Sequence, residues 1–211
     1  MSTSTSAKHQ RVAAVLWDVD GTLSDSFQLG FGATKTVLER NGVASITDAD
    51  YHAGTKYTTP RRLAWHVTGN PDDPVGATLG QQFDDLYVGL VSRDTAPLYE
   101  GIPACLSALR QQDPALQFAA LSNACGAYVR AVLSSNALDS LFPVQLGADE
   151  VPAAKPSGLG LRQCCSALGA DATSCIYVGD APSDAAAAAD AGFLCSVGVT
   201  WGSHSEESVR R

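Results

Sequence analysis

The sequence lacks the features that mark a membrane-spanning or secreted protein. No apolar run approaches the roughly 18 residues that a membrane span needs. Residues 1–10 contain no apolar segment of the kind found in a secretory signal, so we expect a short disordered tail there. This tail is rich in Ser and contains no acid, which leaves a trimmed transit peptide as an alternative. We therefore expect a cytoplasmic protein, with an organelle as the alternative location.

Positive charge is also scarce, because 14 Lys and Arg stand against 22 Asp and Glu and give a net charge of -8. Such a chain repels phosphates at a distance, which argues against a general nucleic-acid binder and against binding to anionic membranes. An anionic ligand would need positive charge supplied locally. With 211 residues, of which 45% are hydrophobic, the chain can bury one core, or one core and a small accessory domain.

The cysteines form no C-x-x-C pair and stand near no spaced His pair, so we expect no zinc site. Apolar neighbours surround each of them, which is typical of reduced, buried thiols in a mid-sized acidic domain. We therefore expect a reducing compartment. The six residues are Cys105, Cys125, Cys164, Cys165, Cys175 and Cys195.

One apolar stretch near the beginning ends abruptly in acids. The run Val12–Trp17 is typical of a strand that is buried on both faces of a parallel sheet. Asp18, Asp20 and Gly21 follow it directly. Ligands of open α/β sheets bind beyond the carboxyl ends of the strands. The pattern therefore predicts that Asp18 and Asp20 face a site.

The segment after this strand is helical, and residues 27–94 contain no convincing strand. We predict a helical bundle over 27–94, inserted into a domain formed by 1–26 and 95–211. The expected helices cover Phe27–Arg40 and Thr78–Arg93, with two more that begin near Thr47 and Thr59.

From Tyr99 onward, helices alternate with short apolar strands, which predicts a doubly wound α/β domain with a mainly parallel sheet. The expected strands are 117–121, 143–146, 175–178 and 193–197, and the expected helices are 102–112, 126–134, 157–168 and 183–191. Two of these strands end in polar residues, at Ser122-Asn123 and at Asp180. We expect these residues to meet Asp18 and Asp20 at one edge of the sheet.

A third carboxylate that converges on Asp18 and Asp20 would be strongly repelled unless a cation neutralised it. Hard oxygen ligands without His or Cys nearby suit Mg²⁺, which proteins usually hold together with a substrate phosphate. The arrangement of Asp18, Asp20 and Asp180 therefore predicts a magnesium site and a phosphorylated ligand.

Four segments together resemble one known family. Asp18-Val19-Asp20-Gly21-Thr22 resembles the first motif of the haloacid dehalogenase-like hydrolase superfamily. Ser122-Asn123 resembles the second motif, Lys155-Pro156 the third, and the stretch Gly179–Asp184 the fourth. They occur in the family's order, with a helical cap between the first two, and the ending Gly198–Gly202 is similar to phosphoglycolate phosphatase-like members. The resemblance covers nearly the whole chain.

The resemblance implies the catalytic roles. Asp18 would be the nucleophile and form an aspartyl-phosphate, which divides one difficult hydrolysis into two displacements. Asp20 would protonate the leaving alcohol and then activate water. Lys155 would balance charge on the nucleophile and on the phosphoryl oxygens.

The resemblance also implies the binding residues. Ser122 and the backbone of Asn123 would donate hydrogen bonds to the phosphate. Mg²⁺ would be held by Asp18 and Asp180 together with the backbone carbonyl of Asp20, and Asp184 would bind or orient this group. The implied metal residues are therefore Asp18, Asp20, Asp180 and Asp184.

The substrate would be chosen by the cap. Thr55, Lys56 and Arg61 belong to its most basic stretch and could reach a second anionic group of the substrate; the alternative is that Arg61 and Arg62 form a solvated helix face. The implied reaction is Mg²⁺-dependent hydrolysis of a small phosphomonoester, with phosphoglycolate as the first candidate. The partner would be a small phosphorylated metabolite, without nucleic acid or membrane, and the chain would be a monomer or a homodimer.

Other functions stay open at this point. A phosphonatase would use a cap lysine as its Schiff base, for which Lys56 is a candidate. A phosphomutase would need a histidine early in the cap, and the stretch Phe27–Gly32 contains none. A phospho-receiver domain has no cap. A non-catalytic module that only binds a phosphate ligand would be expected to have lost Asp18 or Asp20, and both are present.

Overall fold

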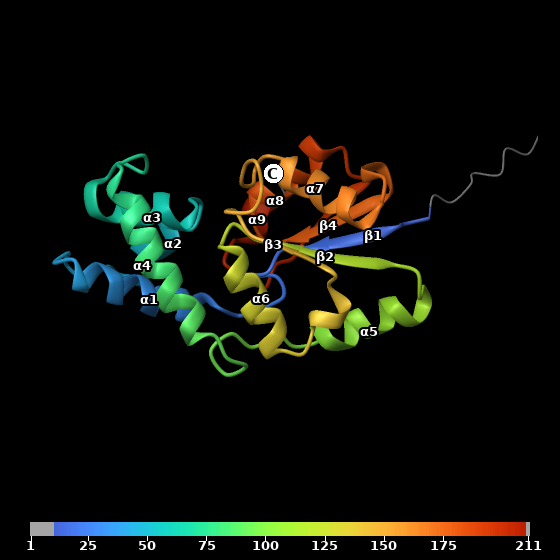
Figure 1. Ribbon diagram of the computed structural model, residues 1–211, viewed down its shortest axis with the longest axis horizontal. Coiled ribbons are helices and arrows are strands. Elements are labelled where there is room, and N and C mark those ends of the chain that lie inside the picture. The colour runs from blue at the N-terminus through green and yellow to red at the C-terminus, as the bar shows by residue number, and fades with distance from the viewer. Residues whose placement is uncertain (1–10, 210–211) are drawn as a thin grey trace, which may run out of the picture.

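A computed structural model describes residues 11–209, so the expected N-terminal tail lies outside the described residues. Within them, five parallel strands form one sheet in the order β3-β2-β1-β4-β5 (Figure 1). The strands are β1 Ala14–Trp17, β2 Gln117–Leu121, β3 Val144–Leu146, β4 Cys175–Gly179 and β5 Cys195–Gly198. This confirms the predicted α/β class, and it makes β1 the central strand, with β2 and β4 on its two sides.

Helices cover both faces of the sheet, which explains why β1 is apolar throughout. Val15 and Trp17 pack into a core with α5 and α6, whereas Ala14 and Leu16 pack into a second core with α7 and α8. These helices are α5 Ile102–Gln112, α6 Gly126–Ser135, α7 Leu159–Leu168 and α8 Pro182–Ala191. Short helical segments complete the order: η1 Asp139–Leu141, η2 Ala172–Ser174 and α9 Glu206–Val209.

Between β1 and α5 the chain forms four helices that pack on one another beyond the sheet (Figure 1). They are α1 Phe27–Arg40, α2 Asp48–Gly54, α3 Thr59–Thr68 and α4 Val75–Leu90. A capping box starts α2, because Thr47 and Asp50 each accept a backbone N–H of the other. The assignment of residues 27–94 to a separate domain stays a prediction.

Several element boundaries differ from the predicted ones by one to three residues, and two of these differences have a clear local reason. Helix α4 begins at Val75 rather than Thr78, because the Asp73 carboxylate accepts the Val75 backbone N–H at 3.0 Å and starts the helix earlier. Strand β5 begins at Cys195 rather than 193, because the Phe193 N–H ends α8 by donating to the Ala188 carbonyl at 3.0 Å.

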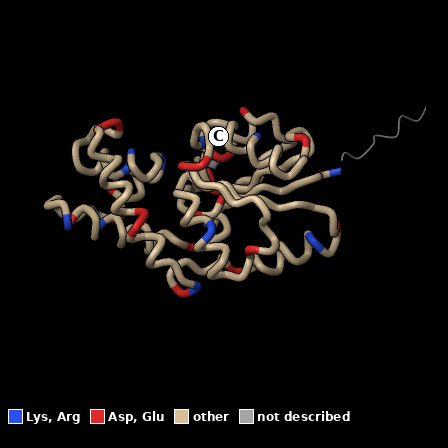
Figure 2. The backbone as a smooth tube through the Cα atoms, in the orientation of Figure 1, with Lys and Arg blue, Asp and Glu red and all other residues tan. Residues whose placement is uncertain are grey.

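The thiols and the charges complete the description of the fold. All six cysteines are free, but Cys105 and Cys195 are exposed, so the expectation that every thiol is buried is wrong for these two. Among the described residues, Lys and Arg are spread over the molecule rather than gathered in one stretch (Figure 2). No helix in residues 11–209 is both long enough and apolar enough to cross a bilayer.

Candidate active site

The carboxyl ends of three neighbouring strands meet at one pocket. Asp18 follows β1, Ser122 follows β2, and Asp180 follows β4. All three line a cavity of about 120 Å³, which the helices α2, α3 and α4 close from the opposite side. The structure therefore brings the polar strand ends together as the parallel topology requires.

Lys155 is buried between two carboxylates. Its Nζ lies 2.7 Å from Asp18 Oδ1 and 2.7 Å from Asp184 Oδ1, and it donates to the Tyr177 hydroxyl at 3.0 Å. Burial alone would lower the pKa of Lys155, but the charges of Asp18 and Asp184 raise it well above its usual value. Lys155 is therefore a fixed cation beside the predicted nucleophile.

The loop that carries Lys155 is held by the polar end of β2. The Asn123 side chain donates to the Lys155 carbonyl at 3.1 Å and accepts the Lys155 backbone N–H at 3.0 Å. These two bonds use the amide group of Asn123, so its side chain orients the backbone of Lys155. Tyr177, which the sequence analysis missed, fixes the other end of the lysine by donating to the Leu121 carbonyl at 2.8 Å.

Three buried carboxylates form a cluster that fits a divalent cation. Asp18, Asp180 and Asp184 each offer an oxygen, and these oxygens lie within 4.8 Å of one another. Lys155 balances only part of their charge. The all-oxygen donor set suits Mg²⁺, and the remaining negative charge favours a cation there.

The backbone at two glycines packs closely against Asp180 in this cluster. Gly21 has a left-handed conformation with φ +75°, and a Cβ at this position would overlap the Asp180 carboxylate. A Cβ at Gly202 would overlap the same group, and the next residue, Ser203, donates its N–H to Asp180 Oδ2 at 2.7 Å. The two glycines therefore let the chain approach Asp180 closely from two sides.

The carboxylate of Asp20 lies outside this cluster and accepts hydrogen bonds from four hydroxyl groups. Oδ1 accepts from Ser26 at 2.5 Å, from Tyr128 at 2.6 Å and from Tyr87 at 3.3 Å, and Oδ2 accepts from Ser122 at 3.1 Å. Asp20 is absent from the group of carboxylates that could share a cation. Its carboxylate is thus kept apart from the metal-binding candidates and held in one orientation.

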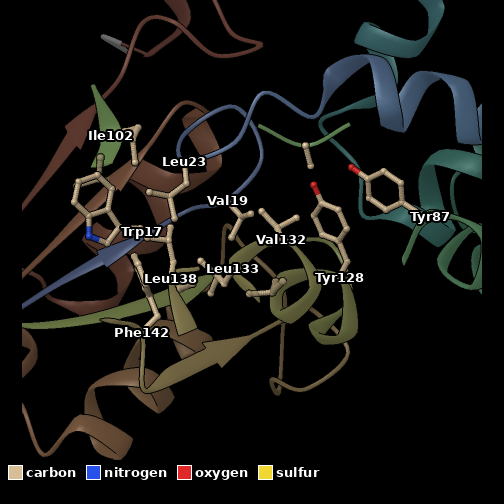
Figure 3. Close-up of a cluster of buried hydrophobic side chains, with 14 of the residues drawn as sticks. Trp17, Val19, Leu23, Tyr87, Ile102, Tyr128, Val132, Leu133, Leu138 and Phe142 are labelled. Carbon is tan, nitrogen blue, oxygen red and sulfur yellow. The ribbon is translucent and has the colours of Figure 1, made fainter. Parts of the chain in front are cut away.

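The two tyrosines come from different parts of the chain. Tyr87 lies on α4 and Tyr128 on α6, and their rings stack with centroids 4.2 Å apart (Figure 3). Burial raises the pKa of both phenols well above the usual value, so both stay neutral and can donate. No sequence motif marks either residue. Their roles follow from tertiary packing alone.

Of the three predicted substrate residues, which follow α2 or lie on α3, only one lines the pocket. Thr55 lines the pocket, but Lys56 and Arg61 do not. Lys56 Nζ lies over the Tyr57 ring, 5.1 Å from its centroid, and Arg61 pairs with Asp72 at 2.9 Å. Neither cation is among the lining residues, and of the two only Arg61 has an acidic partner within residues 11–209.

Arg62 lines the pocket in their place and is only 8% exposed, so it is not part of a solvated face. Helical periodicity could have indicated that Arg62 is buried, because Thr59, Arg62 and Leu63 fall on one face of the helix. In the structure all three residues are buried.

The segment after β5 contributes His204, a further residue of the site that was not predicted from the sequence. His204 Nδ1 lies 3.4 Å from Asp180 Oδ2, and this contact raises the pKa of the imidazole. The His52 side chain of α2 contacts the Ser203 carbonyl. The loop therefore touches both the carboxylate cluster and the helical insertion.

Comparisons with known proteins agree with this picture. A family model described as haloacid dehalogenase-like hydrolase matches residues 15–197. The phosphoglycolate phosphatase of Caulobacter vibrioides is 30% identical over 196 residues, which cover 89% of this chain and 81% of that protein.

Solved structures show the same fold. A haloacid dehalogenase-like hydrolase from Bacteroides fragilis superposes with a TM-score of 0.83 at 24% identity, covering 95% of this chain and 93% of the other. A variant of CbbY from Rhodobacter sphaeroides, in complex with xylulose 1,5-bisphosphate, gives a TM-score of 0.77 at 21% identity, covering 92% and 90%.

The fold and these matches define a hydrolase of the phosphatase type with a parallel α/β sheet. The chain belongs to the haloacid dehalogenase-like hydrolase family, and over most of its length it is similar to members named phosphoglycolate phosphatase. The resemblance that the four motifs predicted is confirmed.

Proposed function

We propose that the chain is a Mg²⁺-dependent phosphatase that hydrolyses a small phosphomonoester, with phosphoglycolate as the first candidate, through an aspartyl-phosphate on Asp18. The arrangement of Asp18 carries this proposal, because its buried carboxylate touches Lys155 and lies in the carboxylate cluster at the base of the pocket. The phosphoglycolate phosphatase relative supports the substrate class. The small cavity agrees with a small ester.

In the first displacement, an oxygen of Asp18 forms a bond to phosphorus while the ester P–O bond breaks. Asp20 gives its proton to the departing alkoxide oxygen. In the second displacement, the Asp20 carboxylate takes a proton from water, the water oxygen bonds to phosphorus, and the bond to Asp18 breaks to release inorganic phosphate. Lys155 offsets negative charge on the phosphoryl oxygens throughout.

The cation would be held by Asp18, Asp180 and the backbone carbonyl of Asp20, with Asp184 joining or orienting this group. When bound, it supplies the positive charge that lets a phosphate approach several carboxylates. The orientation of Asp184 supports this role, because its second oxygen accepts the Ala181 N–H at 2.9 Å at the start of α8.

The helices α1–α4 would form the cap that selects the substrate. Thr55 stays a candidate contact. The Asn123 backbone and Ser122 remain the proposed phosphate donors, and Ser122 would turn its hydroxyl from Asp20 Oδ2 to the phosphate. A phosphonatase would need Lys56 in the cavity as its Schiff base. Lys56 is not among the residues that line the cavity, and its Nζ lies over the ring of Tyr57. This placement favours the phosphatase over the phosphonatase.

The test is release of inorganic phosphate from a panel of phosphate esters. We expect turnover with MgCl₂, loss of turnover with a chelator, and recovery when Mg²⁺ is added in excess. A phosphoglycolate arm and a phosphonoacetaldehyde arm separate the phosphatase from the phosphonatase. A folded chain that hydrolyses no ester in the presence of Mg²⁺ would rule the proposal out in favour of a binding module.

Tyr87→Phe should weaken the step in which Asp20 protonates the leaving group. The variant loses one of the hydrogen bonds that hold the Asp20 carboxyl in position, so proton transfer from a less well oriented carboxyl should lower kcat/KM for an alkyl ester roughly tenfold. It should fall less for p-nitrophenyl phosphate, whose leaving group needs little protonation. Tyr128→Phe should lose more, because its bond is shorter, 2.6 Å against 3.3 Å. Equal losses on both esters would contradict a role in protonation.

A further inference from the structure

Arg62 is a buried cation that forms no ion pair within residues 11–209. The residue is 8% exposed and lines the same pocket as Asp18. Within residues 11–209 its Nε has no hydrogen-bond partner, and the guanidinium makes one hydrogen bond, a long contact of 3.4 Å to the Thr34 hydroxyl. A guanidinium has five N–H donors, so most of its capacity is free.

The orientation of this guanidinium is fixed by aromatic rings. Tyr51 and Phe83 each lie 5.0 Å from its central carbon, measured to the ring centroids. Tyr51 belongs to α2 and Phe83 to α4, so three helices of the insertion converge on this one group. Contacts with ring faces hold a flat cation but accept no N–H in the plane of the guanidinium. The rings therefore leave most N–H groups of Arg62 without a protein acceptor in residues 11–209.

The other cationic groups that line the pocket already have acidic partners. Lys155 contacts Asp18 and Asp184, and His204 contacts Asp180. Among the ion pairs of residues 11–209, none includes Arg62. A buried charge without a partner is unfavourable in a folded chain. An anion from the ligand would remove this cost.

We infer that Arg62 binds a carboxylate of the substrate, at the end opposite the phosphate, and thereby selects phosphate esters of small hydroxy acids. This inference rests on the proposed phosphatase function. A carboxylate fits better than a second phosphate, because it carries one charge and Arg62 offers one. The two further cations of this stretch, Lys56 and Arg61, are held outside the pocket. Two parallel N–H···O bonds are the usual geometry for such a pair.

The test compares Arg62→Met and Arg62→Lys with the wild type on 2-phosphoglycolate and on ethyl phosphate, which lacks the carboxylate. For Arg62→Met we expect kcat/KM to fall roughly 10- to 100-fold on 2-phosphoglycolate, mainly through KM, and to change little on ethyl phosphate. Arg62→Lys keeps the charge without the planar fork and should fall between the two.

Arg61→Met is the matched control, because it removes the neighbouring charge on the same helix, outside the pocket. It should keep the wild-type preference for 2-phosphoglycolate over ethyl phosphate. Competitive inhibition gives an independent measurement. Glycolate should inhibit Arg62→Met more weakly than the wild type, whereas inorganic phosphate should inhibit both equally. Circular dichroism confirms that each variant is folded before it is compared.

Three outcomes would overturn the inference. Equal losses on both esters would make Arg62 a structural residue, and so would an unchanged preference. A larger loss on the bisphosphate of ethylene glycol than on 2-phosphoglycolate would assign a phosphate to Arg62 instead. Failure of the proposed function looks different, because the wild type would then hydrolyse neither ester while its Tm could still be measured. If 2-phosphoglycolate, but not ethyl phosphate, then raised the Tm of the wild type, and neither raised that of Arg62→Met, Arg62 would still be the carboxylate site.

Discussion

Asp18→Asn is expected to lower kcat by on the order of 10⁴-fold or more, because an amide oxygen cannot form the aspartyl-phosphate. The substitution keeps the shape of the side chain. Lys155 keeps its contact with Asp184 at 2.7 Å, so the fold should survive. The measurement is phosphate release under saturating MgCl₂, with the purified variant compared with the wild type at equal concentration.

Stability provides the control for Asp18→Asn. The buried group contains three carboxylates and one lysine, and the substitution removes one negative charge from it. Without added metal the Tm should therefore stay the same or rise, while the stabilisation by MgCl₂ should shrink because one ligand is lost. A variant with near wild-type turnover would show that Asp18 is not the nucleophile.

Lys155→Met should damage both activity and stability. It leaves Asp18, Asp180 and Asp184 without the amine that now lies 2.7 Å from two of them. Removing one partner of a buried ion pair typically costs about 3–5 kcal/mol of unfolding free energy, which urea denaturation would measure. Turnover should fall as well, because the charge that offsets the phosphoryl oxygens is gone.

A double variant separates charge from packing. Lys155→Met with Asp184→Asn removes one negative charge together with the lysine, so it should be more stable than Lys155→Met alone. MgCl₂ should also stabilise the single variant more than it stabilises the wild type, because a cation then replaces the missing charge. A single variant as stable as the wild type in urea would show that Lys155 does not neutralise this cluster.

The strand ends were predictable because topology alone brings them together. Asp18 and Asp180 end neighbouring parallel strands, and an apolar run followed by acids is visible in the sequence. Lys155 lies in a loop, so only the family resemblance indicated it. Once the chain has folded, its Nζ reaches across 137 residues to Asp18.

Other residues of the site show which contacts a local sequence pattern cannot predict. Tyr87 and Tyr128 reach Asp20 across 67 and 108 residues, and no local pattern encodes such a meeting. Arg62 is different. Its place beside Leu63 on the buried face of α3 follows from helical periodicity, which could have separated it from the solvated Arg61. Distant packing, rather than local pattern, therefore fixed the positions of the two tyrosines.

The bond between Tyr87 and Asp20 joins α4 to the end of β1, so the acid is assembled by two parts of the chain at once. Arg62 stands on the same bundle of helices. A substitution that shifts this bundle would therefore displace Arg62 and the Tyr87 hydroxyl together. The residue proposed to recognise the substrate and one hydrogen bond on the proposed proton donor thus depend on the same helix packing.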